Sequence, residues 1–305
     1  MKLTRQLIIL LILNLALFYG ITFTQEGKTI EQKEKKEAEK YIELCKSSLE
    51  KEKPDEAVKY AIKAVEIDDS NSQYHYWLGQ AYGLKAQKAS IFSKFSYAKK
   101  CKKEWIKAVE LDPENIEARM GLLNYYLQAP DIAGGSKKKA KQQAAEIIKI
   151  DPLRGHMAMA QIHEDEKDFS KAEQEYIKAT EVNPEDTGPY YSLGYFYQNR
   201  EKYDKARETF FKILKIDSVD MGAYYQLGRI AVYSGENLKE GITYFKKYLE
   251  HKPKPNNPTW AYAHWRLGMV YEKLGNKEQA ISEYEKAIEL DPDNKEAKES
   301  LKKVK

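Results

Sequence analysis

Two histidines lie seven residues apart in this sequence, and acidic side chains follow the second. His156 and His163 are next to Glu164 and Asp165. Imidazole nitrogens and carboxylates are ordinary ligands of transition metals, so this segment alone could suggest a metal site. The elements that carry the histidines decide whether the side chains converge on one point.

A glycine-rich segment followed by lysines is a second candidate. Gly134, Gly135, Ser136 and Lys137 come directly before an expected helix, and two more lysines follow. Backbone N–H groups at a helix start can hold a phosphate or carboxylate, and three lysines in a first turn oppose the helix dipole. The alternative, which we favour, is that the glycines turn the chain, Ser136 caps the helix and the lysines face water.

No other chemistry-bearing motif is present. The sequence has no nucleophile elbow, phosphate-binding fingerprint, zinc spacing or paired-carboxylate signature, so we expect no enzyme activity, no cofactor and no metal. The net charge of +4 does not demand a polyanionic partner. Two cysteines cannot form a disulfide framework, and 16 glycines and 10 prolines in 305 residues argue against a β-sandwich.

The first 24 residues have the pattern of a targeting segment. Lys2 and Arg5 precede an apolar run that extends to Ile21, as in a secretory signal, and Thr22 and Thr24 permit a weak cleavage site before Gln25. If uncleaved, residues 7–24 are barely long enough to anchor the chain in a bilayer. Either way we expect export to the periplasm or cell envelope. Residues 25–37 are a charged spacer.

The rest of the chain repeats with a period of about 34 residues. Leu-Gly recurs at positions 78, 193, 227 and 267, and Asp-Pro or Asn-Pro recurs at 112, 151, 183 and 291. A period of this length indicates a repeat architecture. The expected units are residues 38–71, 72–115, 116–152, 153–186, 187–220, 221–260 and 261–294. Residues 295–305 are mostly charged and form an expected solvating cap.

These units resemble the tetratricopeptide repeat (TPR) family. The seventh position of the units carries Leu78, Leu193, Leu227 and Leu267, and the eighth carries a small residue in most units, with Leu123 as the clear departure. We expect Leu123 to loosen the third unit. The resemblance implies an all-α fold, a right-handed α-solenoid of about seven helix-turn-helix units.

The repeat gives the histidines and cysteines a packing role. His75, His156 and His264 share the fourth position of their units, and His163 takes a position that tyrosine holds in other units. Cys45 and Cys101 fill positions reserved for small residues, where a buried thiol behaves as a small hydrophobe. A disulfide between them in an oxidising compartment stays open as an alternative.

The second unit carries a ten-residue insertion between its helices. This segment presents Ile91, Phe92 and Phe95 together with lysines. Basic and aromatic residues in alternation can bind nucleic acid or a membrane surface. We expect instead that the lengthened helices pack their aromatics on each other or project to a protein partner. Nucleic acid is excluded as a partner, and membrane contact is expected only through an uncleaved N-terminal segment.

The excess of 23 tyrosines points to a binding face. In TPR proteins the first helix of each unit lines a concave groove, and the resemblance implies the same here. The expected partner-binding residues are Tyr191, Tyr195, Tyr225, Arg229, Tyr262 and Trp265. Tyr, Trp and Arg dominate binding hot spots, although packing between repeats is an alternative role for some of the tyrosines.

The sequence therefore predicts a non-enzymatic exported scaffold that binds a protein or an extended peptide in the groove. The alternative is a periplasmic accessory of a solute transport system, which binds a small molecule or the carrier's partner protein. The sequence names neither the partner nor the oligomeric state.

Overall fold

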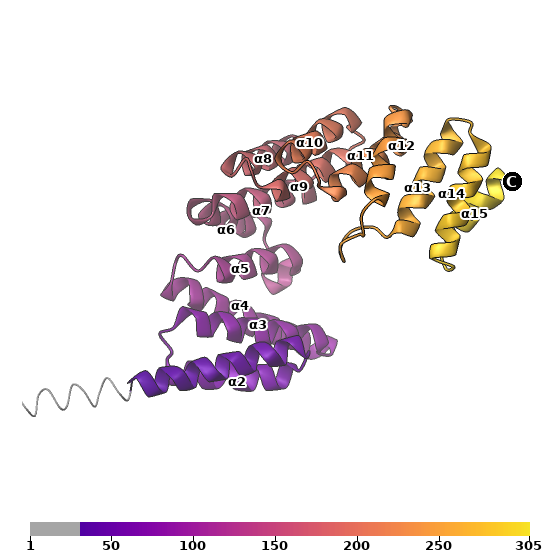
Figure 1. Cartoon of the computed structure of the whole chain (residues 1–305). Coiled ribbons are helices and arrows are strands. Elements are labelled where there is room, and N and C mark those ends of the chain that lie inside the picture. The colour runs from indigo at the N-terminus through magenta and orange to yellow at the C-terminus, as the bar shows by residue number, and fades with distance from the viewer. Residues whose placement is uncertain (1–30) are drawn as a thin grey trace, which may run out of the picture. The chain divides into compact units, whose positions relative to one another are not determined.

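The computed structural model describes residues 31–305, and within them every regular element is a helix (Figure 1). The predicted targeting segment and the start of the charged spacer lie outside the described residues. The chain divides into two compact units, Met1–Asp151 and Pro152–Lys305, which we call unit 1 and unit 2.

Unit 1 consists of antiparallel helix pairs and one short 3-10 turn. A helix over residues 31–50 packs with the next helix, and its Cys45 lies in one apolar cluster with Ala57. The remaining elements are α2 (Pro54–Ile67), α3 (Ser72–Lys88), α4 (Ile91–Leu111), α5 (Ile116–Gln128), η1 (Asp131–Ala133) and α6 (Lys137–Ile150).

The described part of the predicted spacer is helical. Residues 31–37 continue into the helix that ends near residue 50, and their side chains are exposed. Glu, Lys and Gln are good helix formers, so a charged segment that packs on nothing can still extend a helix. No helix within residues 31–305 combines the length and the apolar character needed to cross a bilayer.

Unit 2 repeats the paired arrangement more regularly. The first helices of its pairs are α7 (Pro152–Asp165), α9 (Thr187–Asn199), α11 (Met221–Ser234) and α13 (Trp260–Lys273). Their partners are α8 (Phe169–Val182), α10 (Tyr203–Ile216), α12 (Leu238–Leu249) and α14 (Lys277–Leu290). The cap predicted at 295–305 is helix α15 (Lys295–Val304), which packs on α14 and α13.

Proline sets the ends of several helices. α4, α8 and α14 stop directly before Asp112, Asn183 and Asp291, whose backbones are extended. A residue that precedes proline is disfavoured in the helical region, so the chain leaves the helix there. An asparagine often starts the next helix: the Asn115 side chain accepts a hydrogen bond from the Ala118 N–H at 2.9 Å.

Glycine on the first helix of a pair meets an aromatic ring on the second. A Cβ atom at Gly194 would lie 2.6 Å from Phe210, at Gly228 2.7 Å from Phe245, and at Gly268 2.5 Å from Tyr284. Such separations are far inside van der Waals contact, so only glycine lets the paired helices approach this closely. Gly79 has the same relation to Trp105 in unit 1.

The third pair fills this contact differently. Leu123 replaces the glycine and is buried, and Ala144 occupies the position on α6 that corresponds to the aromatic ring. Because the large and small residues have exchanged helices, the expected loosening at Leu123 has no basis in its burial.

Candidate functional site

The first helices of three pairs in unit 2, α9, α11 and α13, carry the predicted partner-binding residues. Tyr195 on α9 and Tyr262 on α13 are 39% and 37% exposed, and Tyr191, Arg229 and Trp265 are half-buried. Tyr225 is different, because only 5% of it is exposed.

Tyr225 is a core residue and not a contact residue. Its ring centroid lies 5.6 Å from that of Phe245 and 5.2 Å from that of Tyr248. The expectation that Tyr225 touches a partner is therefore corrected. Its ring packs with two aromatic rings of α12, and this contact buries it.

Tyr191 and Trp265 connect elements within unit 2 and expose only part of their rings. The Tyr191 hydroxyl donates to Asp220, the residue that caps α11, and the ring packs edge-on against Phe210. Burial and this hydrogen bond raise the pKa of Tyr191. Trp265 donates from its indole N–H to the Ser300 hydroxyl on α15 at 3.0 Å.

Two arginines flank one tyrosine ring next to these side chains. The guanidinium carbon of Arg229 lies 5.4 Å from the ring centroid of Tyr233, and that of Arg266 lies 5.0 Å from the same centroid. Arg266 also lies 4.2 Å from the ring of Trp265. These cation–π contacts hold both guanidinium groups beside one half-exposed ring.

Neither arginine has an acidic partner among residues 31–305. Arg229 donates from Nη1 to Gln226 Oε1 at 3.4 Å, and Arg266 donates from Nη1 to Met269 Sδ at 3.7 Å. The Nε–H groups of both are buried and lack an acceptor, and the amide oxygen of Gln198 is buried and lacks a donor. A buried donor without an acceptor costs free energy that a suitable ligand group can recover.

The positive charge of the two arginines also affects the ionisation of the ring beside them. Burial opposes ionisation of Tyr233, but the charge of Arg266 and the hydrogen bond and charge of Arg229 outweigh it and lower the pKa of Tyr233. Two neighbouring guanidinium groups suit a carboxylate or a phosphate, because a guanidinium can donate two parallel hydrogen bonds to two oxygens of either group.

Arg266 and Tyr233 were not among the predicted residues. Arg266 is the sixth residue of the repeat 261–294, and Tyr233 is the thirteenth residue of the repeat 221–260. Neither position is one that the resemblance marks as groove-lining. The sequence contains a signal for Tyr233 only, because α11 carries Arg229 and Tyr233 and holds no Asp or Glu. The first helix of a repeat is called helix A. We call the following side chains on α9, α11 and α13 the helix-A face: Tyr191, Tyr195, Arg229, Tyr233, Tyr262, Trp265 and Arg266.

His75 is buried, His156 and His264 are half-buried, and each of these three forms an ion pair with a glutamate. Nδ1 of His75, His156 and His264 faces Glu104 at 2.8 Å, Glu175 at 2.6 Å and Glu283 at 2.5 Å. The first pair is 29 residues apart and the others 19, and the difference is the ten-residue insertion. Within the described chain no group of three or more His, Cys, Asp or Glu side chains could hold a metal.

Both cysteines are free thiols, so the disulfide alternative is not realised in the structure. Cys45 and Cys101 are buried, as their small-residue positions predict. Burial raises the pKa of Cys45 to about 12 and also raises the pKa of Cys101. Thiols with such pKa values are poor nucleophiles at neutral pH.

The structure does not support the predicted anion site at Gly134, Gly135, Ser136 and Lys137. The N–H groups of residues 134, 135 and 136 already donate to the carbonyls of Asp131, Pro130 and Tyr126 at 2.8, 3.1 and 2.8 Å. Gly134 has a positive φ of 88°, and a Cβ at Gly135 would lie 1.8 Å from the Ala129 carbonyl oxygen. The glycines therefore serve the turn, and the Ser136 hydroxyl caps the helix by accepting from the Lys139 N–H.

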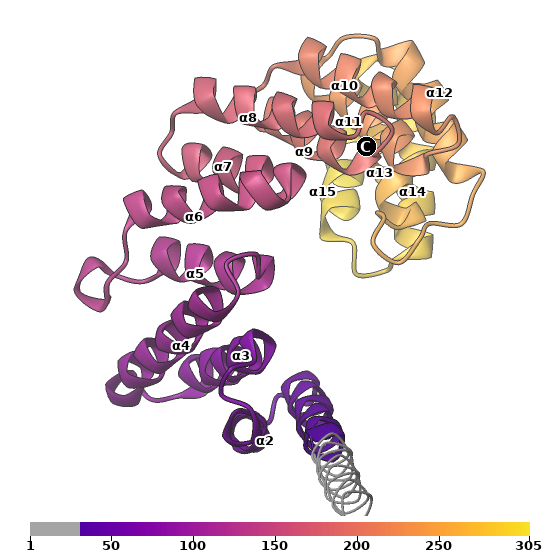
Figure 2. The same ribbon diagram turned by 90° about the vertical axis from the view of Figure 1, so that its left-hand side faces the viewer.

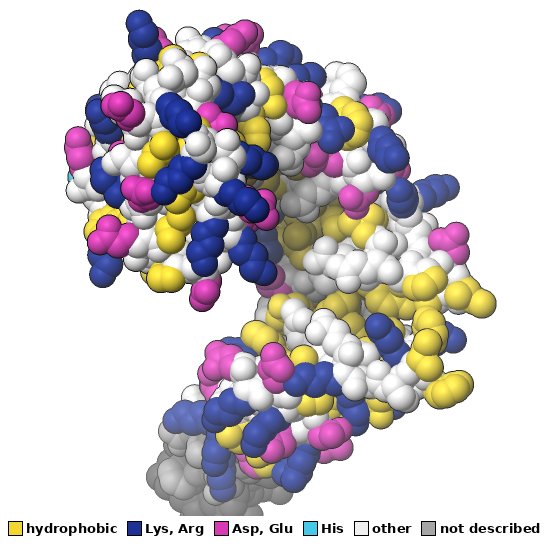
Figure 3. Space-filling view, turned by 90° about the vertical axis from the view of Figure 1, so that its right-hand side faces the viewer, with side chains coloured by type: hydrophobic (Ala, Val, Ile, Leu, Met, Phe, Trp, Pro, Cys, Tyr) yellow, Lys and Arg dark blue, Asp and Glu magenta, His cyan; other side chains and the backbone are white. Residues whose placement is uncertain are grey.

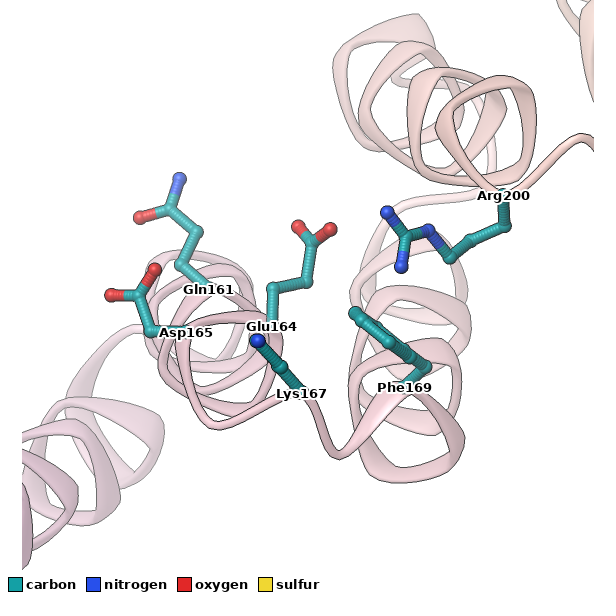
Figure 4. A pocket seen from close by; sticks show the side chains of 6 residues that line it. All are labelled: Gln161, Glu164, Asp165, Lys167, Phe169 and Arg200. Atoms are coloured by element: carbon teal, nitrogen blue, oxygen red, sulfur yellow. The ribbon is translucent and has the colours of Figure 1, made fainter.

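A depression in the surface of unit 2 lies where α7, α8 and α9 meet. Figure 4 shows Glu164 and Arg200 on opposite sides of it, with the Arg200 guanidinium beside the Phe169 ring at 4.0 Å. Glu164 is already engaged, because it accepts a hydrogen bond from the Tyr176 hydroxyl at 2.6 Å. Acidic and basic side chains line this depression together, so it is weaker evidence for an acidic ligand than the helix-A face, where two arginines lie together without an acidic partner.

Comparison with known proteins agrees with the repeat pattern. Models of the tetratricopeptide repeat match residues 153–186, 175–208 and 261–294, and the first and last of these have the limits of two expected units. The yeast (Saccharomyces cerevisiae) heat shock protein STI1 is 48% identical over 48 residues, which are 16% of this chain and 8% of that protein. The match thus spans less than a tenth of that relative's length.

Two solved structures share the fold over most of the chain. A tetratricopeptide repeat protein from Parabacteroides merdae has a TM-score of 0.50 at 15% identity, covering 88% of this chain and 99% of that one. PilF from Pseudomonas aeruginosa has a TM-score of 0.50 at 16% identity, covering 77% and 98%. Repeats of this kind are typical of protein-binding scaffolds without enzyme activity. Together with the paired helices, these matches show that the chain is a tetratricopeptide repeat protein, an all-α solenoid.

Proposed function

We propose that this chain is a non-enzymatic scaffold that binds a protein or extended peptide on the helix-A face of unit 2. The bound segment carries an acidic side chain, which lies against Arg229 and Arg266. The observation that carries this proposal is the pair of guanidinium groups that flank Tyr233, lack an acidic partner among the described residues, and keep buried Nε donors without acceptors.

Charge supports an acidic ligand group. Guanidinium groups form bidentate hydrogen bonds with carboxylates, and the strength of these bonds increases where water is partly excluded. The half-buried position of both arginines meets that condition. A bound carboxylate would accept from the terminal Nη groups of the two arginines.

The aromatic side chains supply the apolar part of the same surface. Tyr195 on α9 and Tyr262 on α13 have exposed side chains. Tyr262 packs edge-on against Trp265, and the two ring centroids lie 6.1 Å apart. Rigid aromatic rings beside arginine are the composition of interface hot spots. We therefore expect the ligand to pair its acidic residue with an apolar one.

The test begins with peptides selected from a phage-displayed random library on the full chain. The selected peptide is titrated by calorimetry against the parent and against a Tyr195→Ala, Tyr262→Ala double variant. We expect the double variant to bind at least about tenfold more weakly, since hot-spot aromatics often contribute about 2 kcal/mol each.

Phe211→Ala is the matched control, because Phe211 is a similarly exposed aromatic on α10, outside the helix-A face. It should leave the affinity unchanged, and circular dichroism should show the same helix content in all variants. Equal affinity of the parent and the double variant would show that the peptide binds elsewhere and would refute the proposed face.

The comparisons do not favour the transport-accessory alternative, and we do not propose it. Export, a periplasmic location and anchoring by residues 7–24 stay predictions, since they rest on residues outside the described part of the chain.

A further inference from the structure

One end of unit 1 exposes large apolar side chains that the protein itself does not cover. Here the end of α3, the start of α4 and the loop after α5 come together (Figure 2). Phe92 and Ile132 are each 92% exposed, and Ile91 is 69% exposed. Of the two expectations for the inserted aromatics, packing on each other does not apply to Phe92, which projects into solvent; projection to a partner stays a prediction.

The insertion creates this end by lengthening both helices of its pair. α3 has 17 residues and α4 has 21, whereas the helices of α9–α10 have 13 and 14. The lengthened part carries Ile91 and Phe92 beyond the region that neighbouring helices cover.

The loop after α5 lies next to the lengthened pair. Lys94 and Phe95 of α4 line one pocket, of about 430 Å³, together with Ala86 of α3 and with Pro130 and Ala133 of the loop. Tyr125 joins these parts, since its hydroxyl donates to the Ala133 carbonyl at 2.7 Å and Lys102 lies 5.1 Å from its ring centroid. Ile132, within this loop, thus belongs to the same end as Phe92.

The segment that carries Ile91 and Phe92 is rich in lysine. Residues 85–103 contain seven lysines and no acidic residue. Lys85 and Lys88 form ion pairs with Asp55 and Glu52. Within the described chain the other five form no ion pair: Lys94, Lys99, Lys100, Lys102 and Lys103.

Helical spacing places part of this charge beside the apolar group. Phe92, Lys99 and Lys103 recur at intervals of seven and four, which puts them on one exposed face of α4. Figure 3 shows hydrophobic side chains gathered along this edge of unit 1, with Lys or Arg side chains next to them. We call Ile91, Phe92, Ile132 and the five unpaired lysines the basic tip.

We propose that the basic tip docks on an anionic lipid bilayer, with Phe92 and Ile132 inserted among the headgroups and the lysines paired with lipid phosphates. Anionic membranes attract clustered lysines, and exposed aromatic and aliphatic side chains enter the interface. Separate side chains that protrude from a helix start and a loop suit a fluid surface, which can close around each one. Long lysine side chains can reach headgroups while the helix stays above them.

The experiment reads out the tip itself, because the apolar run at residues 7–24 of the full chain can bind vesicles on its own. Ser96→Cys places a thiol on the exposed side of α4, and both native cysteines are buried, so an environment-sensitive fluorophore labels the new position. We expect a blue shift with vesicles of phosphatidylcholine and phosphatidylglycerol and none with phosphatidylcholine alone. The same label at Ser282→Cys, exposed on α14, should not respond to either.

Two variants of the labelled chain separate the contributions of shape and charge. Phe92→Ser with Ile132→Ser, and Lys99→Gln with Lys103→Gln, should each weaken the fluorescence response at least about tenfold in lipid concentration. Val219→Ser, at an exposed apolar residue of unit 2, should change nothing.

An absent blue shift at position 96 with anionic vesicles would overturn the proposal, and would leave an acidic protein as the better occupant. A response that survives the Phe92 and Ile132 changes would also overturn it, because the chain would then only adsorb through charge.

Discussion

The pairs α11–α12 of unit 2 and α5–α6 of unit 1 fill the same contact in opposite ways. Gly228 faces the ring of Phe245 in the first pair, whereas Leu123 and Ala144 hold the corresponding positions in the second. All four side-chain positions are buried. These two pairs therefore have a similar summed volume at the contact, with the larger residue on the second helix in one pair and on the first helix in the other.

The exposed surfaces of the two units differ as well. In unit 2 the first helices keep the repeat length and hold half-buried arginines among aromatic rings. In unit 1 an insertion lengthens one pair and exposes apolar side chains among lysines. A regular repeat thus builds a surface for a shaped ligand, while the insertion builds a projecting tip.

A double-mutant cycle in unit 2 tests whether a larger residue on α11 can compensate for a smaller one on α12. Phe245→Ala should destabilise the chain by about 3–5 kcal/mol, since the ring is fully buried. Gly228→Leu should cost about 1–3 kcal/mol by overpacking. The double variant, which imitates Leu123 and Ala144, should cost less than the sum by about 1 kcal/mol or more. Urea unfolding followed by circular dichroism measures all three, and strict additivity would contradict the exchange of volume.

A second prediction concerns an ion-pair cluster of unit 2. Glu173 accepts from Lys205 Nζ at 2.6 Å, Lys202 Nζ at 2.9 Å and the Tyr197 hydroxyl at 3.0 Å. Burial opposes the charge of Glu173, but these bonds outweigh it and lower its pKa to about 2. The stabilisation is therefore complete above about pH 4.5 and is lost as the pH falls toward 2.

Glu173→Gln removes this contribution. At pH 7 we expect a loss of about 1–3 kcal/mol, discounted because the lysines are partly exposed. Toward pH 2 the difference between parent and variant should vanish. A difference that stays constant from pH 7 to pH 3 would show that the effect is not electrostatic.

The smallest expected effect on stability comes from His75 in unit 1. Its contribution decreases as the pH rises, whereas that of Glu173 decreases as the pH falls. Burial disfavours the charged form of His75, but its bonds to Glu104 and to the Asp69 carbonyl, at 2.8 and 3.0 Å, raise its pKa. This contribution is complete below about pH 6.5 and is lost as the pH rises through the raised pKa. We expect about 1 kcal/mol or less.

Glu104→Gln isolates this pair. NMR titration of the His75 ring proton should give a lower pKa in the variant than in the parent. A His75 pKa that does not move would assign its shift to other groups.

Much of the fold follows from the sequence because its signals are local and repeated. Asp112-Pro113 and Asp291-Pro292 end helices by the steric effect of proline, and Gly194, Gly228 and Gly268 mark close helix contacts. The binding face was predicted less well. Tyr225 looked like a groove residue, but the rings of Phe245 and Tyr248 bury it, and that contact depends on the next helix rather than on its own position.

The loop at Gly134 is a different case, because the favoured interpretation of its sequence, a turn with Ser136 as helix cap, agrees with N–H groups that donate to nearby carbonyls. Arg266 was passed over because its charge matters only beside Arg229 and Tyr233, which belong to another repeat. Side chains whose role depends on neighbours across repeats cannot be recognised by their position within one repeat.

The measurement that tests the helix-A face most directly is a double-mutant cycle of binding affinities, in which one change removes a carboxylate of the ligand and the other removes Arg266. A peptide selected on the full chain and its analogue with Glu or Asp replaced by the amide are titrated against the parent and Arg266→Gln. We predict that the amide analogue binds the parent at least about tenfold more weakly, and that this difference largely disappears with Arg266→Gln. Selected peptides without an acidic residue, or an equal loss on both proteins, would contradict the proposed pairing.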